Sequence, residues 1–244
     1  MPKNIFEGDI PYSIGEMKEL YMQDLSRNNF SGELPQPIVS GCVALDLFDL
    51  SNNNFFGQIF PKYMNLTHLH WLYLDNNHFS GKMDDGLRSS TSLEGLDISD
   101  NMLSGNIPNW IGNISTLRVL FMSKNYLEAN IPVQLNHLKS LELIDIFENS
   151  LSGSMVSSFN LSSVKHLYLQ KNAITGDNKF FGRIPYQINE LSNLHVLLLK
   201  GNSLQEHIPN ELCQLAKLRI MDLSNNMFSG SIPSCLGNVS FWRE

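Results

Sequence analysis

The stretch LEGLDISDNMLSGNIP, residues 93–108, carries a pattern that decides the fold because the rest of the 244-residue chain repeats it. The pattern reads L-x-x-L-x-L-x-x-N-x-L-x-G-x-I-P and returns about every 24 residues. Every step between its asparagines is 23 to 25 residues, except for one step of six. The asparagines are Asn4, Asn28, Asn53, Asn77, Asn101, Asn125, Asn149, Asn172, Asn178, Asn202 and Asn226.

Each position of the pattern has a physical role. Alternate apolar residues such as Leu96 and Ile98 point inward from a short strand, and stacked copies make a parallel sheet. An inward asparagine supplies its amide to loop backbone groups that would otherwise be buried without partners, which is worth about 1 to 3 kcal/mol. The sequence therefore predicts an α/β repeat solenoid, a horseshoe or superhelix with a parallel concave sheet and short 3-10 or irregular convex segments.

The array is predicted to be a single domain over residues 1–244, with about ten repeats and no cysteine-paired cap at either end. Asn172 and Asn178 are only six residues apart, so the middle of one repeat joins the middle of another. A deletion of about 18 residues is favoured, with a bulged loop as the alternative. The solenoid is expected to be irregular near residues 172–182.

Smaller departures affect single repeats. Gln23 occupies an apolar strand position, and Ala129 and Glu206 replace the pattern's glycine. Cys213 and Cys235 lie in adjacent repeats, where a disulfide and two buried free thiols are both possible. The third cysteine, Cys42, has no evident partner.

Composition excludes several classes of function. Charged residues make up 17% of the chain and the net charge is −7, so neither nucleic acid nor a membrane surface is an expected partner. No Cys/His spacing suits a metal, and no nucleophile, phosphate-loop or zinc-protease motif is present. We therefore expect no cofactor, no metal site and no enzyme activity.

The predicted ligand-binding surface is the solvent side of the concave strands, six, four and two residues before each asparagine. Aspartates recur four residues before the asparagine, and we interpret this column as a solvated face. Exposed rings are commoner at recognition surfaces, although they also pack across strands without any ligand. The candidate residues are Trp71, Tyr73, Phe121, Asp145, Phe147, His166 and Tyr168.

Sequons N-x-S/T are expected to carry glycans on the side away from the strands. Four of them follow the repeat asparagine by 11 or 12 residues and so lie on one line along the solenoid. A fifth, Asn29, adjoins a repeat asparagine and is less suited to modification. The four are Asn65, Asn113, Asn160 and Asn238.

The segments LSGNIP (103–108), NNFSGELP (28–35) and NNMFSGSIP (225–233) resemble the plant-specific class of leucine-rich repeats. Residues 52–81 and 208–242 are most similar to plant receptor-like proteins. The resemblance implies an ectodomain fragment at the plasma membrane that binds a peptide, protein or glycan and signals through a co-receptor kinase in defence or development. A secreted inhibitor of cell-wall-degrading enzymes and a truncated, non-functional product are the alternatives. As written, the chain shows no signal peptide or membrane helix.

Overall fold

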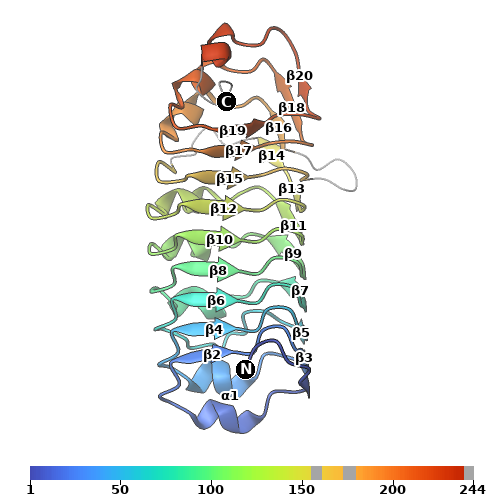
Figure 1. The fold of residues 1–244 in the computed structure, drawn as a ribbon, viewed down its shortest axis with the longest axis vertical. Coiled ribbons are helices and arrows are strands. Elements are labelled where there is room, and N and C mark those ends of the chain that lie inside the picture. The colour runs from blue at the N-terminus through green and yellow to red at the C-terminus, as the bar shows by residue number, and fades with distance from the viewer. Residues whose placement is uncertain (155–160, 173–179, 239–244) are drawn as a thin grey trace.

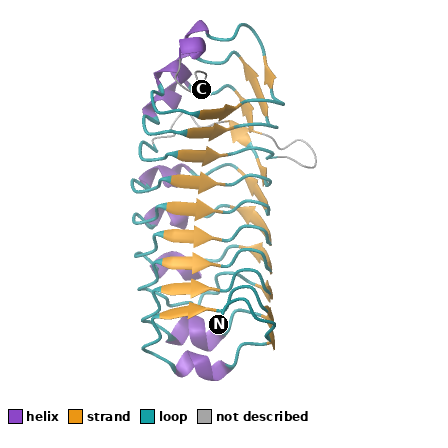
Figure 2. Cartoon of the chain, viewed as in Figure 1, coloured by secondary structure: helices purple, strands orange, loops and turns teal. Residues whose placement is uncertain are grey.

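A computed structural model describes residues 1–154, 161–172 and 180–238. Over these residues the chain forms an elongated stack in which strands lie one above another from the N-terminal to the C-terminal end (Figure 1). Helical turns line one side of the stack and a second set of strands lines the other (Figure 2). The predicted solenoid with a long parallel sheet and short 3-10 turns is confirmed.

One parallel sheet, here called the long sheet, runs the length of the described chain. Neighbouring strands pair in the phase of the repeat, so Leu72 lies beside Leu96 and Leu96 beside Leu120. These central residues are at most 1% exposed, because the middle residue of each strand points into the core. Its nine strands within the described residues are β2 (Met22–Asp24), β4 (Leu47–Asp49), β6 (Trp71–Tyr73), β8 (Gly95–Asp97), β10 (Val119–Phe121), β12 (Leu143–Asp145), β15 (His166–Tyr168), β17 (Val196–Leu198) and β19 (Ile220–Asp222).

A second set of parallel strands, here called the side sheet, had not been predicted. It is formed by residues that follow repeat asparagines, and the inward apolar residue of these segments, such as Leu103, is fully buried. Because every repeat turns at the same point, these segments also meet in register and exchange backbone hydrogen bonds. The first part comprises β1 (Glu7–Gly8), β3 (Asn29–Gly32), β5 (Asn54–Gly57), β7 (His78–Lys82), β9 (Met102–Asn106), β11 (Tyr126–Ala129) and β13 (Ser150–Leu151), and the second β14 (Gly153–Ser154), β16 (Phe180–Gly182), β18 (Ser203–Glu206) and β20 (Met227–Phe228).

A proline immediately precedes most of the short helices. Pro108, Pro132, Pro185 and Pro209 each stand immediately before a 3-10 helix, where the fixed φ of proline suits the turn and its missing N–H is no loss. The helices are η1 (Tyr12–Glu16), α1 (Gln36–Gly41), η2 (Gly86–Ser89), η3 (Asn109–Asn113), η4 (Val133–His137), η5 (Tyr186–Glu190), η6 (Asn210–Gln214) and η7 (Ser234–Asn238).

The repeat asparagines connect neighbouring repeats. The Asn101 Nδ2 donates to the carbonyls of Leu74 at 3.0 Å, Ile98 at 3.2 Å and Ser99 at 3.0 Å. Its Oδ1 accepts the N–H of Phe79 at 3.0 Å. Bonds of the same kind, with Nδ2 donating to backbone carbonyls and Oδ1 accepting an N–H of the preceding repeat, are made by Asn28, Asn53, Asn77, Asn125, Asn149 and Asn226.

At the irregular join the asparagine hydrogen bonds are incomplete. Strand β15 pairs directly with β17, so the repeat asparagines of these two neighbouring strands, Asn172 and Asn202, are 30 residues apart in the sequence. The Nδ2 groups of both asparagines still donate to backbone carbonyls. Their buried Oδ1 atoms accept no hydrogen bond from any group in the described parts of the chain. Asn178 lies outside the described residues.

The smaller sequence departures are accommodated locally. Ala129 and Glu206 adopt the φ that the pattern's glycine would take, at 62° and 65°, in the left-handed region that glycine favours. Cys213 and Cys235 form a disulfide, which decides between the two possibilities that their spacing left open. Cys42 is a buried free thiol.

Candidate ligand-binding face

The long sheet positions all the candidate binding residues on its outer face. Trp71 and Tyr73 lie on β6, Phe121 ends β10, and His166 and Tyr168 lie on β15. Each flanks a strand residue that is buried in the core, so the pleat turns the candidates outward. Asp145 ends β12 and Phe147 follows it. All seven candidate side chains are half-buried.

The rings gather at two places on this face. Trp71 and Tyr73 stack with centroids 6.3 Å apart and an interplanar angle of 11°. The Trp71 ring also lies over Gly95 of the neighbouring strand, where a side-chain carbon would be only 2.3 Å from its Cε3. The indole therefore covers Gly95, and a larger residue at that position would collide with it.

The second group of rings crosses between strands. His166 stacks on Tyr168 at 6.4 Å and on His195, which precedes the neighbouring strand β17, at 6.2 Å. The cross-strand packing considered from the sequence is thus real here. Phe121 and Phe147 belong to no ring pair among the described residues, and they separate the two ring groups along the sheet.

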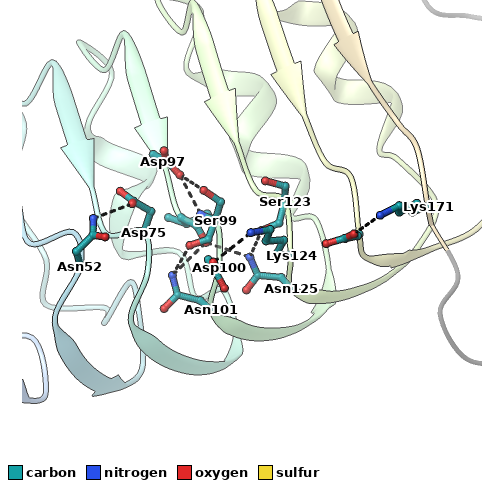
Figure 3. Close-up of polar contacts among 12 residues, drawn as sticks. Asn52, Asp75, Asp97, Ser99, Asp100, Asn101, Ser123, Lys124, Asn125 and Lys171 are labelled. Atoms are coloured by element: carbon teal, nitrogen blue, oxygen red, sulfur yellow. Dashed lines mark hydrogen bonds and ion pairs between the residues drawn. The ribbon is translucent and has the colours of Figure 1, made fainter. Parts of the chain in front are cut away.

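The column of aspartates holds the turns that follow the strands. The carboxylate of Asp97 accepts from both the N–H and the hydroxyl of Ser99 (Figure 3). The carboxylate of Asp145 accepts the Phe147 N–H at 3.1 Å. Asp24, Asp49 and Asp222 accept the N–H two residues later in the same way. These acids therefore have a structural role beyond keeping the face solvated.

Burial raises the pKa of several acidic groups on and beside this face. It raises the pKa of Asp75 to about 7, with the nearby carboxylates of Asp97 and Asp49 adding to the effect. Burial, followed by the charge of Asp97, raises the pKa of Asp145 to about 6. Burial and then Asp49, Asp97 and Asp75 raise the pKa of Tyr73. Asp75 escaped the sequence analysis because it stands two residues before its asparagine, outside the aspartate column.

The sequence analysis also did not identify a row of charged side chains just before the strands of the long sheet. The Asp46 carboxylate lies 2.6 Å from the His70 Nδ1, and Glu142 lies 3.0 Å from Arg118 and 2.7 Å from Lys165. The last two contacts lower the pKa of Glu142, Lys165 first. All lie seven residues before a repeat asparagine, and their alternating signs in the sequence could have revealed them. These pairs join neighbouring repeats, and because they are largely exposed to solvent they contribute little to stability.

The predicted glycan sites are partly described. Asn65 and Asn113 are exposed, Asn113 at the end of η3 on the helical side. Asn238 ends η7, but its side chain lies outside the described part, as does Asn160 altogether. Asn29 is exposed and its Oδ1 accepts from Asn54 at 2.6 Å.

No cluster of three or more His, Cys, Asp or Glu side chains in the described ranges could hold a metal ion. Within the same ranges no helix has the length and apolar character needed to cross a bilayer.

The repeat and the paired sheets define the class of this protein, which is a leucine-rich-repeat solenoid. The Leucine Rich Repeat family matches residues 68–90, 92–114, 193–215 and 217–239. More particularly, the repeat region is similar to that of plant receptor-like proteins and to the ectodomains of plant receptor kinases.

Curated relatives match short parts of the chain. Receptor-like protein 13 of Arabidopsis thaliana is 41% identical over 66 residues, which is 27% of this chain and 6% of the relative. Receptor-like protein 9b of the same plant is 42% identical over 69 residues, covering 28% and 7%. The matched stretches span 6% to 20% of the curated relatives' lengths.

Solved structures match almost the whole chain. The ectodomain of the Arabidopsis receptor kinase HAESA, in complex with an extended IDA peptide hormone, is 33% identical with a TM-score of 0.86, covering 98% of this chain and 39% of that one. A plant ice-binding protein, 23% identical with a TM-score of 0.79, covers 94% and 74% and shares the fold alone. The fold therefore defines the class, whereas what the face binds depends on the residues that line it.

Proposed function

We propose that this chain is the ligand-binding part of a plant receptor-like ectodomain, and that it binds an extended peptide across the outer face of the long sheet. The observation that carries the proposal is the pair of ring groups, Trp71 with Tyr73 and His166 with Tyr168, at matching positions of two distant repeats. Rings already held in place by packing bury area at small entropic loss when a ligand arrives.

The distance between the ring groups suits a peptide. Strands β6 and β15 are separated by β8, β10 and β12, which makes four interstrand steps. At about 4.8 Å a step the ring groups are roughly 19 Å apart, the length of about six extended residues. Phe121 and Asp145 lie on two of the intervening strands and would contact the middle of such a peptide.

The wider biological role follows from the relatives. HAESA has been solved with the peptide hormone IDA and the co-receptor SERK1. By analogy, this ectodomain acts outside the plasma membrane, where a bound ligand recruits a co-receptor kinase for signalling in defence or development. Glycans at Asn65 and Asn113 would leave the long sheet free, because these residues lie after the strands of the side sheet.

Selection from a phage-displayed random peptide library tests the proposal. Peptides selected on the wild-type chain are measured against Trp71→Ala and Tyr168→Ala, and against Tyr126→Ala as a matched control. Tyr126 is a 63% exposed ring on the side sheet, away from the proposed face. We expect about tenfold or greater loss of affinity for the first two variants and little change for the control.

Selected peptides that bind all three variants as well as the wild type would refute the proposed face. Far-ultraviolet circular dichroism of each variant separates loss of a contact from loss of the fold.

A further inference from the structure

A hollow of about 640 Å³ opens beside β3 and β5, away from the outer face of the long sheet. Its floor includes Ile10 and Leu34, which are buried in the core. Three rings at its wall remain exposed: Tyr12 at 74%, Phe56 at 49% and Tyr63 at 43%. Such a group of exposed rings around an open space is unusual on a solvated surface, and it offers three aromatic side chains to a ligand.

Two carboxylates share this hollow, and glycines make room for them. Asp9 lies over Gly32, where an added side-chain carbon would be 2.5 Å from its Oδ1. Glu33 lies over Gly57 in the same way, with its Cγ 3.0 Å from such a carbon. Neither carboxylate belongs to an ion pair with a described residue. The hollow thus combines rings with two unpaired negative charges.

The chain itself shows what fits a tyrosine at this position. Tyr12 and Tyr186 both stand eight residues after a repeat asparagine, and Asp9 and Arg183 both stand five residues after it. The Arg183 guanidinium lies over the Tyr186 ring, 4.7 Å from its centroid. In the N-terminal repeat the corresponding residue is Asp9, so the cation is replaced by an anion and the Tyr12 ring is left uncovered.

We propose that the hollow bounded by Tyr12, Phe56, Tyr63, Asp9 and Glu33 binds an arginine side chain from a basic segment of a partner protein. The guanidinium takes the place over Tyr12 that Arg183 takes over Tyr186, and it forms ion pairs with the two carboxylates. Planar guanidinium stacks on rings and bonds carboxylates in a fixed fork, which suits this site better than an ammonium group does. The site is separate from the peptide face proposed above.

Binding of a fluorescent hexa-arginine peptide, followed by anisotropy, tests the site. Tyr12→Ala should weaken binding about two- to fivefold, the ratio expected for one exposed cation–ring contact. Asp9→Asn with Glu33→Gln should weaken it further and reduce its dependence on salt. The matched control is Asp85→Asn with Glu128→Gln, which removes the same charge from exposed residues outside the hollow.

A gain-of-contact variant provides an independent check. Asp9→Arg should cover Tyr12 from within, as Arg183 covers Tyr186, and block the peptide while leaving the melting temperature near that of the wild type. Equal weakening by the hollow variant and the charge-matched control would overturn the proposal, because binding would then report net charge alone. Unchanged binding to Tyr12→Ala would overturn it as well. Neither result would bear on the peptide face, whose variants lie on the long sheet.

Discussion

Replacing Asn101 with alanine tests how the repeats are held together. The change removes three donated bonds and the bond that Oδ1 accepts from the buried Phe79 N–H. The carbonyls of Leu74 and Ile98 each keep a second donor, from Asn77 and Asn125. The Phe79 N–H is the group left without this acceptor, at about 1 to 3 kcal/mol, and the weakened carbonyl contacts bring the expected loss to roughly 2 to 4 kcal/mol.

Asn202→Ala is the matched control, because the Oδ1 of Asn202 accepts nothing from the described residues. Its replacement removes donors only and should destabilise the chain by about 1 to 3 kcal/mol less than Asn101→Ala. Urea unfolding followed by circular dichroism gives the two midpoints, with the slope checked for constancy. Equal losses for the two variants would refute the reasoning that the accepted N–H bond dominates.

Three further outcomes are expected. Glu206→Gly should raise the free energy of unfolding by about 0.5 to 1 kcal/mol. Glycine removes the backbone strain of a φ of 65°, and part of this gain is offset because glycine has more conformational freedom in the unfolded chain. Thermal melting measures the change in stability. Cys213→Ser should cost about 3 kcal/mol through the 22-residue closed loop and expose the last repeat to limited proteolysis, whereas an unchanged digestion pattern would contradict this. Because the pKa of Asp75 is raised, its carboxyl group holds a proton more tightly in the folded chain than in the unfolded chain. Its contribution therefore favours folding at low pH and is lost as pH rises from about 3.8 to about 7. Urea unfolding at a series of pH values should show that Asp75→Asn reduces this loss of stability.

For the binding face, the sequence predicted on which side of the strands the candidate side chains lie, but not what they contact. The period placed Trp71, Tyr73, His166 and Tyr168 on the solvent side of strands, because alternation within a strand is a local property. It gave no means of knowing that the Trp71 ring covers Gly95, since that contact joins neighbouring repeats. The role of the candidates in binding stays a prediction.

For the charged residues too, the sequence predicted positions but not contacts or burial. Acids at a fixed distance from each asparagine were visible in the sequence, but the bond from the Ser99 hydroxyl to Asp97 and the burial of Asp75 were not. A pKa depends on all the neighbours in space, and for Asp75 the nearest acids come from the strands on either side.

By itself the sequence determined the repeat, its phase and the asparagine in each turn, because a pattern that recurs about every 24 residues can bury its apolar side only by stacking. Tertiary structure alone decided the side sheet, the direct pairing of β15 with β17, and the pairing of Cys213 with Cys235. These features depend on which backbone and side-chain groups meet between repeats, and that meeting is fixed by the stacked chain as a whole rather than by any one repeat.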